Sequence, residues 1–153
     1  MPETLSSDPT PEDYAAFVGL RATLVPAGQY TLDGRTVSCK SMPTVLNPHL
    51  DDYASSFPKF IVVRPDMMAK PPTAVKLWIY YHECGHEFIG PDESKADCYS
   101  VTQGVKEGWL GPSDLDDVCS FIRSAQQDAT HFAGPDRCVA IRSCYAKTTH
   151  VRR

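Results

Sequence analysis

Residues 73–88 read TAVKLWIYYHECGHEF, the clearest helix-forming stretch of the chain. Its apolar residues fall nearly all the way round a helical wheel, which is typical of a helix buried at the centre of a domain. Pro71-Pro72 precede the stretch, with Thr73 as the expected N-cap, and Gly90-Pro91 follow it. The sequence therefore predicts a central buried helix over residues 73–88.

This helix contains His82-Glu83-Cys84-Gly85-His86, an H-E-x-x-H pattern. Residues four apart share one helix face, so both imidazoles can bind a single ion. Zn²⁺ suits imidazole and carboxylate ligands, and it keeps an open position when three protein groups bind it. Glu83 follows the first histidine, from where its carboxylate can reach a metal-activated water and act as general base. We therefore expect one Zn²⁺ per chain and hydrolysis of peptide bonds.

A third metal ligand is expected from the segment Glu93-Ser94-Lys95-Ala96-Asp97, which falls on the next predicted helix. Glu93 and Asp97 share one face of that helix. One carboxylate can bind the metal while the other accepts the free ring N–H of a ligand histidine. Because only six residues separate the second histidine from Glu93, Asp97 stays open as the alternative ligand, with Glu93 favoured.

The two motifs together, H-E-x-G-H followed by E-x-x-A-D, resemble the gluzincin metallopeptidases. Among the gluzincins, the motifs most resemble the group that includes CaaX prenyl proteases and their soluble bacterial relatives. The segment ESKADCY, residues 93–99, is also similar to a stretch of bacterial neutral zinc metallopeptidases. Thr130-His131, with Arg137 six residues after the histidine, resembles a third segment of the prenyl-protease group. The resemblance covers roughly residues 60–141.

The resemblance implies a role for each matching residue. It implies a zinc centre with three protein ligands: His82, His86 and Glu93. Glu83 would be the general base, and Asp97 would orient a ligand histidine. His131 would face the oxyanion that forms on the substrate, with Arg137 nearby. The implied protein is a gluzincin-like endopeptidase.

The expected fold is α+β and zincin-like. A small antiparallel or mixed sheet would pack on the metal-binding helix and on a glutamate-bearing helix, and two further helices would complete the core. Lys59–Arg64, KFIVVR, is the clearest strand, and Asp33-Gly34 is a hairpin turn signal. The strand has two interpretations of equal weight, either the cleft edge that takes an extended substrate or an ordinary core strand. A short helix is expected over Asp13–Leu20.

Three helices are predicted after the central one: residues 92–106, Ser113–Gln126 and 134–146. Asp92 caps the first of them. The second carries apolar residues at i, i+3, i+4 and i+7 from Leu115 to Ile122. We expect one domain over residues 13–147, with a mobile segment at 1–12 and a frayed tail at 148–153.

Composition excludes several classes of protein. The chain has 153 residues, 15 Lys plus Arg, 19 Asp plus Glu and a net charge of −4. A mildly acidic chain without a basic stripe is a poor candidate for nucleic-acid binding. The purest apolar runs, Phe60–Val63 and Leu77–Tyr81, are far too short to cross a membrane. The expected partner is a peptide or protein substrate, and a monomer is favoured over an oligomer.

The cysteine content favours an exported protein with at least one disulfide over six buried thiols. The six cysteines contain no C-x-x-C pair. Cys138 and Cys144 lie about 9 Å apart along one helix, too far to pair with each other, so each needs a partner such as Cys119. Cys84 and Cys98 are expected on two helices that meet at the metal, either as neighbours or as a bridge. Cys84 points away from the metal face.

The N-terminus, MPETLSSDPT, shows no signal peptide. Either the protein is cytosolic, or a signal once preceded this sequence and has been removed. The cysteines favour the second interpretation, with a periplasmic or secreted protein.

Two further functions compete with the peptidase. One is a zinc-bearing binding or adaptor module that keeps the fold without turnover. The other is a structural zinc site in which Cys98 joins the two histidines and Glu93 in a closed set of four ligands.

Overall fold

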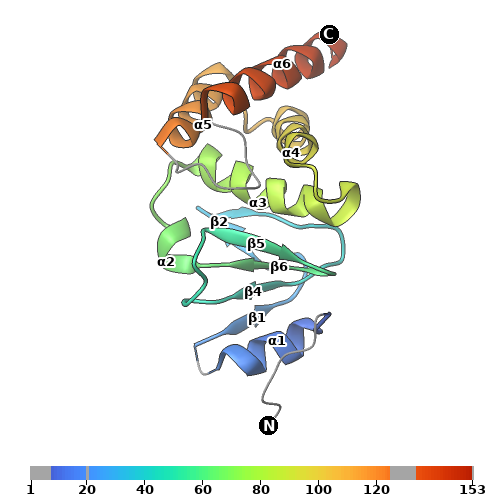
Figure 1. Ribbon diagram of the computed structural model, residues 1–153, viewed down its shortest axis with the longest axis vertical. Coiled ribbons are helices and arrows are strands. Elements are labelled where there is room, and N and C mark those ends of the chain that lie inside the picture. The colour runs from blue at the N-terminus through green and yellow to red at the C-terminus, as the bar shows by residue number, and fades with distance from the viewer. Residues whose placement is uncertain (1–7, 20, 125–133, 153) are drawn as a thin grey trace. The chain divides into compact units, whose positions relative to one another are not determined.

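The computed structural model describes residues 8–19, 21–124 and 134–152, and the chain divides into two compact units, Met1–Lys70 and Pro71–Arg153. The described strands all lie in the first unit, and the described part of the second is helical (Figure 1). The predicted α+β class with a small mixed sheet is therefore confirmed. The domain predicted over residues 13–147 spans both units.

The first unit is built on a four-stranded mixed sheet in the order β1-β4-β6-β5. Its strands are β1 (Thr23–Val25), β4 (Thr44–Leu46), β5 (Ala54–Phe57) and β6 (Phe60–Val63). β4 and β6 run parallel, whereas β1 on β4 and β5 on β6 are antiparallel. All four β6 residues are buried. The predicted strand is thus present, but its interpretation as the cleft edge is wrong, because β4 and β5 pair with both of its sides.

A separate hairpin joins β2 (Thr31–Leu32) to β3 (Arg35–Thr36). Asp33 and Gly34 both have positive φ, 52° and 80°. A two-residue turn with two positive φ values matches the twist of the flanking strands, which is why Asp-Gly predicts it correctly.

The helix α1 (Pro11–Val18) covers one face of this sheet through a small apolar core. Tyr14 packs there against Val45, Phe60 and Val62. The helix begins two residues earlier than predicted, because the Thr10 side chain accepts the backbone N–H of Asp13 at 3.0 Å and caps it. A one-turn helix, α2 (Pro65–Met68), ends the first unit.

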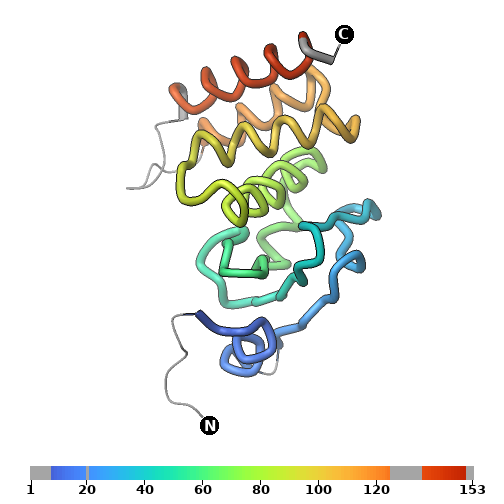
Figure 2. Tube along the Cα trace, turned by 90° about the vertical axis from the view of Figure 1, so that its right-hand side faces the viewer, coloured from blue at the N-terminus to red at the C-terminus, as the bar shows by residue number. Residues whose placement is uncertain are grey.

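The second unit contains α3 (Thr73–Ile89), α4 (Glu93–Glu107), α5 (Pro112–Ser124) and α6 (Gly134–Arg152). α3 packs on α4 and α5, and α6 packs on the same two helices (Figure 2). Residues 74–82 of α3 are all buried, as predicted for a central helix. The prediction of Thr73 as its cap is wrong, because Pro72 occupies the cap position with extended backbone and Thr73 is already helical. The predicted apolar stripe of α5 is buried.

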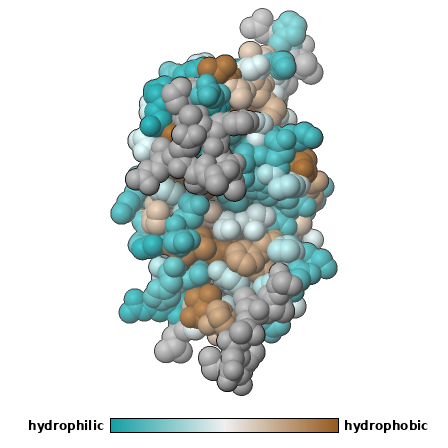
Figure 3. All heavy atoms as spheres, in the orientation of Figure 1, coloured by the Kyte–Doolittle hydropathy of each residue, from teal (hydrophilic) through white to brown (hydrophobic). Residues whose placement is uncertain are grey.

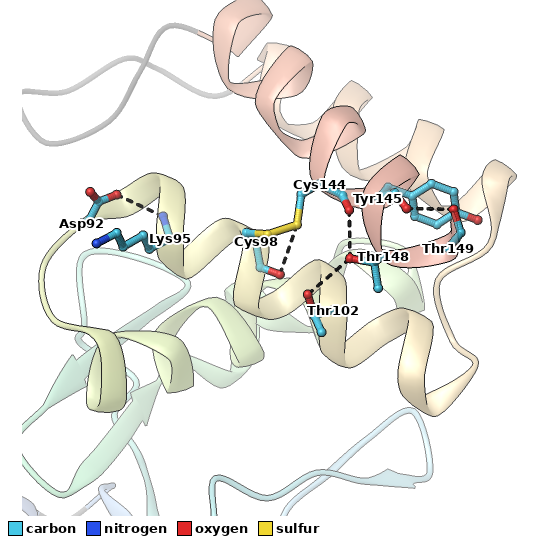
Figure 4. Close-up of a disulfide and its surroundings, with 8 residues drawn as sticks. All are labelled: Asp92, Lys95, Cys98, Thr102, Cys144, Tyr145, Thr148 and Thr149. Carbon is cyan, nitrogen blue, oxygen red and sulfur yellow. Dashed lines mark hydrogen bonds between the residues drawn. A yellow bond between two sulfur atoms is a disulfide. The ribbon is translucent and has the colours of Figure 1, made fainter. Parts of the chain in front are cut away.

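Disulfides join α6 to both of its neighbours. Cys98 of α4 is bonded to Cys144 (Figure 4), and Cys119 of α5 to Cys138. The second pair confirms the predicted partner of Cys138. A bridge between Cys84 and Cys98 is ruled out by the first pair. Cys39 and Cys84 are each half-cystines as well, so no cysteine is free.

The last helix continues to Arg152, beyond the predicted end at residue 146. Thr148 and Thr149 donate to the carbonyls of Cys144 and Tyr145 at 2.8 and 2.9 Å, and Thr148 lies 3.5 Å from Thr102 of α4 (Figure 4). The described part of the segment predicted to be a frayed tail, residues 148–152, is thus helical.

The face of the molecule shown in Figure 3 is mostly hydrophilic, with smaller hydrophobic patches between the polar residues. Four large hydrophobic side chains are exposed among the described residues: Phe17, Phe88, Ile89 and Val139. The described helices include none whose length and hydropathy would allow it to span a membrane.

Candidate metal centre

Three side chains converge at the junction of α3 and α4. Nε2 of His82 lies 2.9 Å from Oε1 of Glu93, and Nε2 of His86 lies 3.2 Å from both of those atoms. In a tetrahedral Zn²⁺ site the ligand atoms are about 3.3 Å apart, given metal–ligand distances of about 2.0–2.1 Å. The triangle is therefore close to the size that one such ion requires, and these residues could hold a metal ion.

A close approach of the two helices brings Glu93 to the histidines. A Cβ on Gly85 would lie 3.2 Å from Cα of Ala96 and from Cβ of Tyr99. Such a distance is tighter than most Cβ contacts, so a larger residue at this position would push the two helices apart by a few tenths of an ångström. After α3 ends, the Asp92 side chain caps α4 by accepting the Lys95 N–H at 3.0 Å, and Glu93 becomes the first residue of that helix.

The orientation of His86 is set by its own helix terminus. Its Nδ1 lies 2.8 Å from the carbonyl oxygen of Gly90. A carbonyl can only accept, so Nδ1 carries the proton and Nε2 is left with a lone pair facing His82 and Glu93. This is the tautomer that a metal-binding histidine needs.

The orientation of His82 is set by two further residues. Its Nδ1 lies 2.7 Å from Oδ1 of Asp97, which is 2% exposed. Arg137 of α6 then donates twice to the same carboxylate, from Nε to Oδ2 at 2.8 Å and from Nη2 to Oδ1 at 2.9 Å. The guanidinium also lies over the Trp78 ring, 5.0 Å from its centroid. Arg137, Asp97 and His82 thus form a chain of contacts that ends at the candidate metal position.

The same contacts change the proton affinities. Burial alone would lower the pKa of His82, but the hydrogen bonds to Asp97 and Glu93 outweigh it and raise that pKa from 6.5 to about 9. Burial would raise the pKa of Asp97, yet the Arg137 and His82 hydrogen bonds hold it below its usual value. In the metal-free protein at neutral pH, His82 is therefore protonated between two carboxylates.

Glu83 lies beside this group without being part of it. Its Oε2 is 4.0 Å from Nε2 of His82, and its side chain is 17% exposed. A half-buried carboxylate that is next to a metal position and outside the ligand set has the placement that a general base requires.

The structure brings six of the seven predicted site residues together in the second unit: His82, Glu83, His86, Glu93, Asp97 and Arg137. Glu93 lies with the histidines, whereas Asp97 contacts the far nitrogen of His82, so the geometry favours Glu93 over Asp97 as third ligand. His131 lies outside the described residues. Cys98 is in a disulfide and has no thiolate to offer, which excludes the predicted four-ligand site. Trp78 was not predicted, although its position one turn before His82 could have indicated it.

Comparison with protein-family models, curated proteins and solved structures found no match to this chain. The interpretation of the site therefore depends on its own geometry and chemistry.

Metal affinity should depend on pH because a proton occupies the site first. Below about pH 9 the metal must displace the His82 proton, so the apparent affinity should rise about tenfold per pH unit between pH 6 and 8. The same proton stabilises the metal-free fold below pH 6.5, and this contribution is lost as the pH rises through about 9. Co²⁺ titrations at pH 6, 7 and 8 measure the slope. An affinity that stays flat over this range would contradict the protonated state of His82.

Proposed function

We propose that the protein is a zinc-dependent peptidase with a zincin-like catalytic centre. The observation that carries this proposal is the arrangement of His82, His86 and Glu93 around one point, with the Glu83 carboxylate next to them. Two imidazoles and one carboxylate are the ligands of many catalytic zinc sites, which keep the fourth position for water or substrate. A closed structural site would need a fourth protein ligand.

The residues around the ion would divide the chemistry among them. A bound Zn²⁺ would polarise a substrate carbonyl and lower the pKa of a water in its open position. Glu83 would accept the proton of the attacking water and later deliver it to the leaving amine. Gly90 holds His86 in the required tautomer, and Asp97 would keep the proton on Nδ1 of His82 when its Nε2 gives up a proton to bind the ion.

Electrostatics supports this division of roles. Asp97 and its cation Arg137 balance each other, so the pair orients His82 without adding net charge to the site. The three protein ligands then carry a single negative charge, that of Glu93. One carboxylate on a divalent ion leaves net positive charge at the centre, which favours polarisation of a carbonyl oxygen.

The proposed location is outside the cytoplasm. Disulfides are typical of exported proteins, and every cysteine of this chain is in one. A periplasmic or secreted peptidase is the specific form that we propose.

The test is hydrolysis of a complex peptide mixture, followed by mass spectrometry. Protein loaded with Zn²⁺ should generate new peptides, and protein stripped with a chelator should not until Zn²⁺ is returned. The new termini would define which residues flank the cleaved bond. If the protein binds Zn²⁺ in its three-ligand site and cleaves nothing, the proposed activity is wrong and the binding or adaptor module takes its place.

A further inference from the structure

The attachment of α6 to the rest of its unit depends on few apolar contacts. Among its side chains that the structure describes, those buried below a tenth of their surface are Cys138, Ile141 and Cys144. Two of these three are half-cystines. The helix has no continuous apolar stripe, and its other contacts with α4 and α5 include exposed polar pairs such as Arg142 with Asp116. Besides the Arg137–Asp97 pair, α6 is therefore docked mainly by one buried aliphatic side chain and two disulfides, so the disulfides supply much of its attachment.

The disulfides lie next to the residues that orient His82. Asp97 directly precedes Cys98 on α4, and Arg137 directly precedes Cys138 on α6. The Cα atoms are 5.7 Å apart across Cys98–Cys144 and 5.4 Å apart across Cys119–Cys138. Each disulfide therefore fixes backbone within one residue of the Asp97–Arg137 pair.

The two crosslinks also act on α6 in different ways. Cys138 and Cys144 are six residues apart, which places the two attachment points about 9 Å apart along the helix axis. One attachment leads to α5 and the other to α4, where Thr102 and Thr148 meet one turn further along (Figure 4). Two separated attachments to two different helices stop α6 from sliding or rotating, so the guanidinium of Arg137 stays over the Asp97 carboxylate.

We propose that high-affinity metal binding at this centre requires the Cys98–Cys144 and Cys119–Cys138 disulfides, with Arg137 as the positioning residue that transmits their effect. This inference rests on the metal centre proposed above. When α6 is released, the buried Asp97 loses its cation and no longer holds the His82 ring in place. The centre would then be completed only after oxidative folding, in a compartment where disulfides persist.

The redox step balances in both directions. On oxidation two cysteine thiols form one S–S bond, and their two protons and two electrons pass to a disulfide-bearing oxidant, which becomes a dithiol. On reduction a dithiol reductant supplies the same two protons and two electrons and leaves as a disulfide.

The test measures the Co²⁺ affinity of the full chain by its visible absorption. Cysteine variants replace chemical reduction, because dithiols bind metal themselves. The double variants C98A/C144A and C119A/C138A should each bind Co²⁺ about 10- to 100-fold more weakly than wild type, the range typical for loss of a group behind a ligand. Arg137→Gln with both disulfides intact should weaken binding to the same degree and shift the Co²⁺ spectrum. Adding Arg137→Gln to C119A/C138A should cause little further loss of Co²⁺ affinity, because both changes remove the same support of Asp97.

The control is Arg142→Gln, which removes a different, exposed ion pair of α6 and should leave the affinity unchanged. Double cysteine variants that are folded by circular dichroism and bind Co²⁺ like wild type would overturn the inference. If those variants do not fold, Arg137→Gln decides, because wild-type affinity and spectrum in that variant would also overturn it. A wild-type protein that binds no Co²⁺ refutes the metal centre itself, whereas binding without peptide hydrolysis refutes only the peptidase.

Discussion

Replacing Glu83 by glutamine should abolish peptide hydrolysis while leaving the metal in place. Glu83 lies 4.0 Å from Nε2 of His82 and outside the group of three ligands. Glutamine keeps the size and polarity of the side chain but cannot accept a proton from water at neutral pH. The loss of a positioned general base costs about 10²- to 10⁴-fold in rate. We expect kcat to fall by this amount, with KM and metal content nearly unchanged.

The control for this variant is Glu87→Gln, one turn along the same helix. It makes the same chemical change outside the ligand group and should keep wild-type turnover. Measurements of kcat and of bound metal on both variants separate loss of the base from loss of the ion. Turnover of Glu83→Gln at the wild-type rate would disprove the assignment of the base.

Replacing His86 by alanine should remove the metal. The variant loses one of three protein ligands, and the Gly90 carbonyl loses the donor that now ties it to the ring. We expect the dissociation constant for Zn²⁺ to rise by about 10³-fold, more than the 10- to 100-fold cost of losing a group behind a ligand. In wild type, free Zn²⁺ at 100 times its dissociation constant should add about 2.7 kcal/mol to the free energy of unfolding. At the same concentration of free Zn²⁺, the free energy of unfolding of His86→Ala should hardly increase.

The matched control is His150→Ala, which removes an exposed histidine of α6. Chemical unfolding with and without Zn²⁺ is the measurement. Equal stabilisation of His86→Ala and wild type by Zn²⁺ would show that the ion binds elsewhere. Equal loss of the Zn²⁺-dependent stabilisation in His86→Ala and His150→Ala would show that a histidine on the surface takes part in binding the ion.

Local patterns in the sequence predicted much of what positions the centre. The apolar circumference of residues 73–88 predicted the buried helix α3, and the i, i+4 spacing of His82 and His86 placed both rings on one face of it. The Asp92 cap predicted where α4 begins, and with it the position of Glu93. These features depend on residues close together in the chain, which is why a linear pattern shows them.

Other expectations could not be derived from local patterns. The choice between Glu93 and Asp97 depends on the distance and angle between two helices, and Gly85 against Ala96 sets that distance. The strand Phe60–Val63 was equally compatible with an edge or an interior position, because burial on two faces does not reveal how many neighbours a strand has.

Local sequence is sufficient for the ligand types, their spacing on α3 and the number of cysteines available for crosslinking. The pairing of Cys98 with Cys144, and the contact of Arg137 on α6 with Asp97 on α4, forty residues away, follow from helix packing. These contacts join helices that are distant in the chain. A helical pattern specifies which face of each helix is apolar, but the packing of all four helices of the second unit specifies which faces meet.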